Sequence, residues 1–251
     1  MSATTLTIAD GVATITLAQP DSRNALSNAL VDSLGDQLSQ AIADDGVRVV
    51  VLTNESHVFC AGADLTGGDG SEPRYSLVDI FELILGSPKP VIGRIAGHCM
   101  GGGVGLAAAC DISVVTEEAK IGFTEVRIGV APAMISVICL PKMRRADAME
   151  LFLSGERISA ARAVEVGLLN RVVPADELDR TVGEIVANVA AGGPLALAAA
   201  KRLVNEVPAM DRAEAFAFTE PLSVDLFASD EATEGIAAFR EKRAARWVPE
   251  G

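Results

Sequence analysis

The first residues of the chain alternate between apolar and polar side chains. Leu6–Ile8 and Val12–Leu17 carry this alternation on either side of Asp10 and Gly11. Alternation is typical of strands with one buried face, and an Asp-Gly pair between two such runs favours a tight hairpin turn. We therefore expect an antiparallel hairpin as the first element.

Further along the chain, the apolar positions predict helices alternating with strands. Ser27 is a good N-cap for a helix that runs to about Asp44, and the β-branched run Val47–Leu52 is typical of a buried strand. This order indicates an α/β fold followed by a helical tail. Further helices are predicted over residues 76–85, 106–110, 145–154, 160–166, 177–191, 194–206, 211–227 and 231–243, and further strands from residue 91, at 111–115, within 121–129 and at 169–173. Residues 53–59 are expected to form a loop, and the glycine-rich segment 67–73 is expected to be mobile.

The composition excludes several classes of partner. The 251 residues are 49% hydrophobic, which is enough for a large core, and their formal net charge is −13 without a basic block. This charge argues against nucleic acids and anionic membranes as partners. The apolar runs are shorter than the ~20 residues that span a bilayer, and no signal peptide is expected. We therefore expect a cytoplasmic protein.

The residues that commonly bind metals are few and scattered. None of the four cysteines belongs to a CxxC pair, and the chain has two histidines. We expect no metal site, and we expect the thiols to be free and buried in a reducing compartment.

Candidate chemistry begins at a glycine-rich turn between a buried strand and a short apolar helix. The stretch Ile95–Asp111 contains the consecutive glycines Gly101–Gly103. Glycines let the backbone approach a ligand closely. The first N–H groups of a helix lack intrahelical partners and carry partial positive charge. The turn therefore predicts a site for an anion or an oxyanion, although a tight turn between packed elements has the same composition.

Two further stretches supply a second backbone donor and a carboxylate. Phe59–Leu65 leaves a strand through small residues, so it can present a backbone N–H without obstruction. Phe123–Pro132 places Glu125 among apolar residues. Loss of solvent there raises the pKa of a carboxyl group toward the range useful for proton transfer.

Taken in order, these motifs resemble the crotonase (enoyl-CoA hydratase/isomerase) superfamily. The matching stretches are Phe-Cys-Ala-Gly-Ala-Asp-Leu at 59–65, Ile-Ala-Gly-xxx-Gly-Gly-Gly-x-x-Leu-Ala-x-x-Cys-Asp at 95–111 and Phe-x-Glu-x-x-x-Gly at 123–129. The similarity continues through 154–168 and 227–243 and covers essentially the whole chain. It implies an α/β spiral of repeated ββα units over residues 1–190, which carries the acyl-CoA site. It also implies a C-terminal helical region over 191–251, which mediates trimerisation and contacts CoA.

The resemblance also implies roles for individual residues. The thioester oxygen lies between the backbone N–H groups of Ala63 and Gly102, fixed donors of the kind that stabilise an enolate, and Glu125 is the acid/base. Coenzyme A is part of the substrate, and no separate cofactor is implied. For Arg23 and Lys242 a solvated surface charge is an alternative interpretation, and for Phe239 core packing is one. The positions that match substrate- or CoA-binding residues are Arg23, Ala25, Ala61, Asp64, Leu65, Thr124, Phe239 and Lys242.

One position departs from the family's hydratase pattern. Hydratases usually hold a water between two glutamates, whereas here Gly105 stands at the first of these positions and Glu125 at the second. Two carboxylates divide water activation and proton delivery, while a single carboxylate naturally moves a proton between carbons. From whole-chain similarity we expect a hydratase-type lyase acting on acyl-CoA thioesters, with an enoyl-CoA isomerase as the alternative.

Other functions are compatible with the same scaffold. A non-catalytic acyl-CoA-binding member has no need of Glu125, and a decarboxylase or thioesterase would use the same backbone donors. RNA binding, known for some relatives, is disfavoured by the acidic charge. The alanine-rich helices 194–206 and 211–227 expose more apolar surface than a lone domain tolerates, which favours a homotrimer or a dimer of trimers.

Overall fold

The larger of two sheets begins with the expected hairpin. The computed structural model describes residues 2–66 and 72–248, so most of the segment expected to be mobile lies outside the described residues. Asp10 and Gly11 have φ angles of 50° and 75°, which suit a tight hairpin turn. The sheet has the order β1-β2-β3-β5-β7-β10, and only the β1–β2 pair is antiparallel. Its strands are β1 (Thr4–Ala9), β2 (Val12–Leu17), β3 (Val49–Asn54), β5 (Val91–Ile95), β7 (Ile112–Thr116) and β10 (Arg171–Val173).

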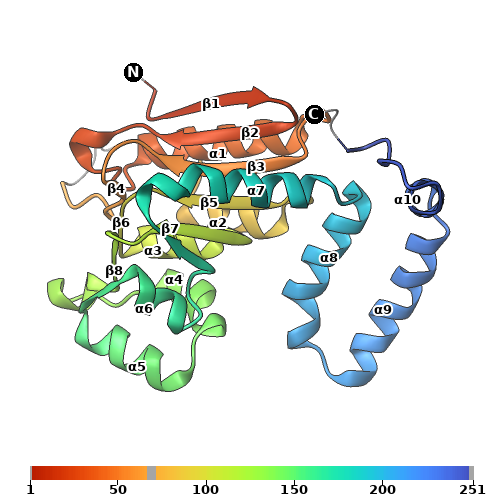
Figure 1. Ribbon diagram of the computed structural model, residues 1–251. Coiled ribbons are helices and arrows are strands. Elements are labelled where there is room, and N and C mark those ends of the chain that lie inside the picture. Colours follow the sequence, from red (N-terminus) through yellow and green to blue (C-terminus); the bar gives the residue numbers. More distant parts are fainter. Residues whose placement is uncertain (1, 67–71, 249–251) are drawn as a thin grey trace.

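The two faces of this sheet pack against different helices. Val50 and Leu52 of β3 belong to the core that includes α1 (Asn28–Ala43) and α2 (Leu77–Gly86). Val49 and Val51 instead pack with α7 (Leu178–Ala190). Figure 1 shows α7 in front of the sheet and α1 and α2 behind it. A strand buried on both faces explains why its sequence is continuously apolar rather than alternating.

A second, smaller sheet was not predicted from the sequence. It has the order β4-β6-β8-β9, and its strands are β4 (Val58–Cys60), β6 (His98–Met100), β8 (Lys120–Gly122) and β9 (Arg157–Ser159). The prediction of a loop over 53–59 was therefore wrong at both ends, since Thr53 and Asn54 complete β3 and Val58 and Phe59 belong to β4. Residues 98–100, assigned to the glycine turn, form β6. Strands of three residues are too short to show a period of two.

The short strands complete the repeating unit of the fold. Three times in succession, a strand of the large sheet is followed by a strand of the small sheet and then by a helix. The units are β3-β4-α2, β5-β6-α3 and β7-β8-α4, with α3 at Gly102–Ala109 and α4 at Ala133–Cys139. This arrangement confirms the expected spiral of ββα units. Two further helices, α5 (Arg145–Ser154) and α6 (Ala160–Glu165), come before and after β9 in the sequence.

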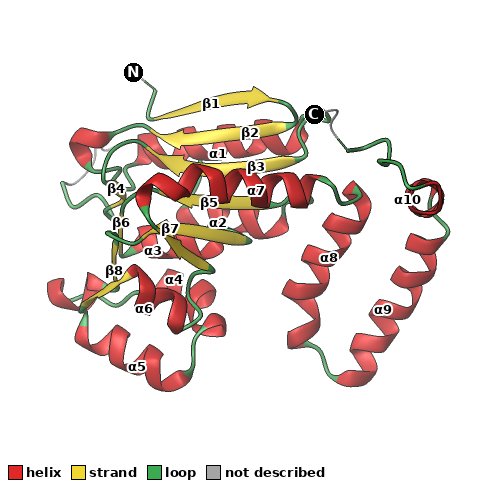
Figure 2. Cartoon of the chain, in the orientation of Figure 1, coloured by secondary structure: helices red, strands yellow, loops and turns green. Residues whose placement is uncertain are grey.

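Beyond β10 the described chain is helical: α7 packs on the large sheet, and the helices after it extend away from the sheets (Figure 2). After α7 come α8 (Pro194–Glu206), α9 (Arg212–Phe227) and α10 (Asp230–Glu241), here called the C-terminal arm. Lys201 of α8 ties the arm to the core, because its buried Nζ lies 2.8 Å from Oδ2 of Asp111 and donates to the carbonyl oxygen of Ile84 at 2.6 Å. Within the described residues no single helix has the length and hydropathy to cross a membrane. The segments 175–190 and 194–209 have sufficient length and hydropathy only when taken together, and the pair is bent by 108°.

Candidate active site

A pocket of about 910 Å³ opens beside the small sheet and is lined by every stretch that the sequence analysis singled out for chemistry. The loop after β4, the start of α3 and the residues that follow β8 all contribute to its wall. Its lining includes Ala61, Gly62, Ala63, Leu65, Gly101, Gly102, Thr124, Glu125 and Ile135.

The loop after β4 lies directly against the glycine turn because both segments have glycine at the point of contact. Gly62 has a φ of +92°, and a Cβ there would stand 2.8 Å from the carbonyl oxygen of Met100. The carbonyl of Gly62 accepts a hydrogen bond of 2.8 Å from the N–H of Leu26, and Leu26 in turn bridges to Ala63. These contacts hold Ala63 beside the first residue of α3, Gly102.

The backbone N–H groups of Ala63 and Gly102 are available to a ligand. In the described part of the chain neither group donates a hydrogen bond, and both residues line the pocket. Gly102 is the first residue of an eight-residue helix, so its N–H has no acceptor one turn earlier in that helix. Two free N–H groups in one pocket are the donors that a developing negative oxygen requires.

The carboxylate of Glu125 lies at the same turn. Glu125 belongs to a short 3₁₀ helix, η2 (Thr124–Ile128), where the sequence predicted a strand and a turn. A Cβ placed on Gly101 would stand only 3.2 Å from Oε1 of Glu125, so a side chain at this position would crowd the carboxylate. The N–H of Gly101 also donates to the carbonyl of Gly122 at the end of β8, 3.0 Å away. Neighbouring parallel strands thus bring together two motifs that lie far apart in the sequence.

The surroundings of Glu125 favour its protonated form. The side chain is half-buried, and its Oε2 is buried without a hydrogen-bond partner among the described residues. Burial raises the pKa of this carboxyl group above its ordinary value of 4.5, and a hydrogen bond from its own backbone opposes the shift. The apolar setting read from the sequence therefore has the expected effect, and it suits a group that must both accept and donate a proton.

The space next to Gly105, where family hydratases carry another glutamate, is filled by apolar side chains. A Cβ on Gly105 would stand 2.4 Å from Cγ2 of Ile135 and 2.9 Å from Cζ of Phe81. Both side chains are almost completely buried. A carboxylate at position 105 would therefore displace α4 or α2. The packing around Gly105 thus leaves no room for a glutamate at this position.

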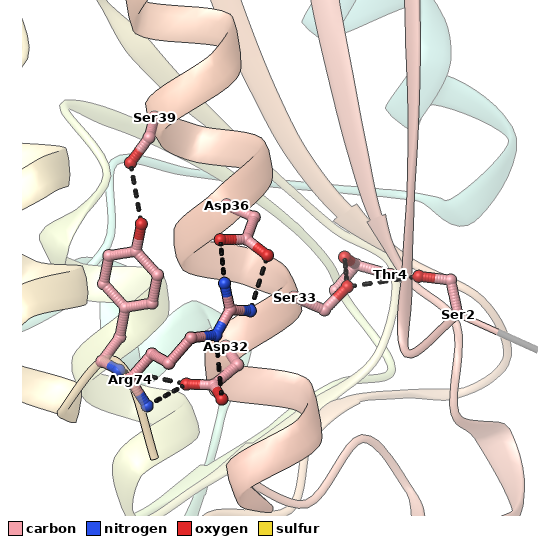
Figure 3. Close-up of polar contacts among 8 residues, drawn as sticks. Ser2, Thr4, Asp32, Ser33, Asp36, Ser39 and Arg74 are labelled. Atoms are coloured by element: carbon pink, nitrogen blue, oxygen red, sulfur yellow. Dashed lines mark hydrogen bonds and ion pairs between the residues drawn. The ribbon is translucent and has the colours of Figure 1, made fainter.

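One wall of the pocket is fixed by carboxylates on α1 (Figure 3). The guanidinium of Arg74 donates to both carboxylate oxygens of Asp36, at 2.9 and 2.7 Å, and Asp32 accepts from the backbone N–H groups of Arg74 and Tyr75. Tyr75 lies close to α1 at Gly35, where a Cβ would stand 2.5 Å from its ring. This network positions Tyr75, which lines the pocket.

The other residues named by the sequence analysis lie outside the pocket lining. Arg23 and Ala25 lie in the loop before α1, and the carbonyl of Arg23 accepts from the N–H of Ala61 at 3.1 Å. Asp64 lies between two lining residues, and its carboxylate accepts from the backbone and hydroxyl of Thr66. Phe239 and Lys242 are exposed at the end of the C-terminal arm.

Two polar residues close to the glycine turn have partners within the fold. Nδ1 of His98 accepts a hydrogen bond of 3.0 Å from the N–H of Lys120, and the carboxylate of Asp111 accepts from the N–H of Val91. The cysteines are buried and free. In contrast, no motif pointed to Tyr75 or Ile135 as lining residues, because tertiary packing alone brings them to the pocket.

Comparisons with known proteins agree with this architecture. The family model for enoyl-CoA hydratase/isomerase matches residues 7–250. The enoyl-CoA hydratase EchA19 of Mycobacterium tuberculosis is 33% identical over 240 residues, which cover 92% of this chain and 90% of that protein. The crystal structure of an enoyl-CoA hydratase from Mycobacterium smegmatis superposes with a TM-score of 0.91 at 30% identity, covering 98% of this chain and 99% of that one. A second, from Bacillus anthracis, gives 0.90 at 32% identity, covering 99% and 100%. The predicted resemblance is confirmed, and the chain belongs to the enoyl-CoA hydratase/isomerase (crotonase) family of enzymes.

Proposed function

We propose that this enzyme adds water to enoyl-CoA thioesters, with Glu125 as its acid/base and the N–H groups of Ala63 and Gly102 as the oxyanion site. The observation that carries the proposal is the position of the Glu125 carboxylate against Gly101, in the same pocket as two free N–H groups. The similar proteins described above are named enoyl-CoA hydratases, which supports the same reaction.

The proposed reaction uses one proton carrier. Ionised Glu125 takes a proton from water while the water oxygen bonds to the β-carbon of the substrate. The electron pair of the double bond moves toward the thioester, and the two N–H groups stabilise the resulting enolate oxygen. Protonated Glu125 then gives its proton to the α-carbon, which restores the carbonyl and the ionised carboxylate.

Isomerisation is the second candidate, and the wall at Gly105 favours it. Because Ile135 and Phe81 fill the space beside Gly105, no second carboxylate among the described residues lines the pocket to help hold a water there. Glu125 alone is sufficient to remove a proton from the α-carbon of a 3-enoyl thioester and return it to the γ-carbon. The same oxyanion site would stabilise the dienolate between the two proton transfers.

For the remaining contacts, we propose the assignments that the family resemblance implies. Residues 1–190 form the core with the acyl-CoA site, and residues 191–251 form the oligomerisation region of a homotrimer or dimer of trimers. Phe239 is 86% exposed, which suits a residue that contacts CoA bound to a neighbouring subunit. The proposed substrate contacts are Arg23, Ala25, Ala61, Asp64, Leu65, Thr124, Phe239 and Lys242.

Two substrates distinguish hydration from isomerisation. Purified enzyme is incubated with crotonyl-CoA and with 3-hexenoyl-CoA, and loss or gain of the conjugated enoyl thioester is followed by absorbance. We expect Glu125→Gln to lower kcat/KM on the accepted substrate about 10²- to 10⁴-fold, since general acid–base catalysis typically contributes that much. Glu118→Gln, which changes an exposed carboxylate outside the pocket, is the matched control and should retain full activity.

The same measurements can reject the proposal. Full activity of Glu125→Gln on either substrate would remove Glu125 from the mechanism. A wild-type enzyme that binds acyl-CoA but converts neither substrate would be a binding protein on this scaffold.

A further inference from the structure

Two arginines line the pocket on the same side as Glu125. Arg127 follows Glu125 by two residues in η2, and Arg157 is the first residue of β9, where it pairs with Gly122 of β8. The stem of each arginine lies close to a glycine. A Cβ on Gly155 would stand 3.1 Å from Cγ of Arg127, and one on Gly122 would stand 3.3 Å from Cγ of Arg157. Strand pairing and the two glycines therefore bring both side chains to the part of the pocket that carries Glu125.

This arginine pair, Arg127 and Arg157, has no counter-ion within residues 2–66 and 72–248. Neither guanidinium forms an ion pair or a hydrogen bond there. Among the described residues they are the only cations that line the pocket, and Glu125 is its only carboxylate. The chain as a whole has 34 acidic and 21 basic residues, so unpaired positive charge at a pocket stands out against its acidic background. Such a place favours an anionic ligand group.

The orientation of the acyl-CoA in the pocket determines which of its anionic groups reaches the arginine pair. If the thioester oxygen lies at Ala63 and Gly102, CoA leads toward 61–65 and the acyl carbons pass Glu125. Because both arginines line the same pocket as Glu125, a group at the far end of the acyl chain can reach them. A guanidinium binds a carboxylate through paired, charge-assisted hydrogen bonds. We infer that this enzyme selects acyl groups that end in a carboxylate, that is, CoA monothioesters of dicarboxylic acids. This inference rests on the proposed function, because that function sets the direction of the substrate.

A phosphate of CoA offers similar anionic oxygens, so the experiment varies the acyl group and keeps CoA constant. Isothermal titration calorimetry measures the Kd of glutaryl-CoA against pentanoyl-CoA, and of adipyl-CoA against hexanoyl-CoA. The members of each pair share a chain length and differ in the terminal carboxylate. We expect wild-type enzyme to bind the carboxylated member about tenfold more tightly in at least one pair. Arg127→Gln and Arg157→Gln should each remove most of this preference while changing the Kd of the neutral member less than about twofold.

Two controls separate recognition from general electrostatics and from misfolding. Arg171→Gln removes an exposed positive charge of β10 that does not line the pocket, and it should keep the preference. Arg157→Lys keeps the positive charge but not the planar guanidinium, and it should keep part of the preference for the carboxylated thioester. Melting temperatures verify that each variant is folded.

Other outcomes would overturn the inference. If the arginine variants lose equal affinity for both members of a pair, the arginines contact a CoA phosphate. If the variants keep the preference unchanged, the arginines bind neither group. Because the readout is binding, it is independent of turnover. A protein that converts no enoyl thioester, yet loses its preference in the arginine variants, would contradict the proposed function and retain the carboxylate site.

Discussion

Glu125 holds a carboxylate where solvent is scarce, and the fold gives its buried oxygen no donor among the described residues. Burial raises the pKa of this group above 4.5, so the folded protein binds the proton more tightly than the unfolded chain does. Stability therefore falls as pH rises through the interval between the unfolded and the folded pKa. The residue proposed for catalysis thus destabilises the fold at neutral pH, which is common for functional groups.

Replacing Glu125 by Gln tests this linkage. The amide has nearly the same shape and does not ionise, so we expect Glu125→Gln to melt at a higher temperature than wild type at about pH 7.5. The difference should shrink as pH falls below the raised pKa, where the folded wild-type side chain is protonated. Thermal melts of both proteins from pH 4 to 8 measure it. A difference that is constant or grows in acid would contradict the raised pKa.

The glycines of α3 allow this helix to pack closely against its neighbours. A Cβ on Gly103 would stand 2.4 Å from the carbonyl oxygen of Cys60, and one on Gly105 would stand 2.4 Å from Cγ2 of Ile135. The helix therefore lies as close to β4 and α4 as its backbone allows. Its position fixes the free N–H of Gly102 relative to Glu125.

Gly105→Ala measures how tightly α3 and α4 pack. Alanine favours a helix by roughly 1 kcal/mol over glycine, but overpacking of a core typically costs about 1–3 kcal/mol. We expect overpacking to outweigh propensity, so the free energy of unfolding in urea should fall. The double variant Gly105→Ala/Ile135→Ala should lose less unfolding free energy than the sum of the losses of the two single variants, because the clash is then absent.

Gly183→Ala in α7 is the matched control for this prediction. A Cβ at Gly183 meets nothing within 4 Å, so the same substitution should stabilise the protein by up to about 1 kcal/mol. Stabilisation at both positions would mean that α4 yields to the added methyl group.

Sequence patterns predicted these elements unequally. The helices from α7 onward begin and end within about two residues of their predicted bounds, because α7, α8 and α10 are amphipathic and the N-caps Asp211 and Ser229 define the starts of α9 and α10. The strands β4, β6 and β9 each have three residues, and only pairing with distant neighbours makes them strands. Motifs predicted Glu125 and the glycine turn, whereas contact between Gly105 and Ile135 depends on the tertiary fold.

The C-terminal arm contacts the core through α8 and is uncovered over much of its length. Lys201 and Asp111 fix α8 on the core, yet α9 has no buried residue in the described chain. Phe216, Val224 and Phe227 of α9 are 66%, 63% and 74% exposed. Their spacing places them on one side of the helix. Composition predicted excess apolar surface in these helices, whereas the contacts of Lys201 and Asn205 with the core depend on the tertiary fold.

Assembly through α9 is the prediction that follows from this surface. We expect wild-type protein to sediment as a trimer or a hexamer of its 26.0 kDa chain, because contiguous apolar surface of this extent is normally covered. Replacing Phe216 and Phe227 together by Ser should shift it toward the monomer without lowering helix content, since neither side chain contributes to the core of the single chain. Ile8→Ser, on the edge strand β1, changes a partly exposed apolar residue outside the arm and should leave assembly intact. A wild-type monomer in sedimentation velocity would contradict the proposed oligomer, and with it the idea that Phe239 reaches CoA on a neighbouring subunit.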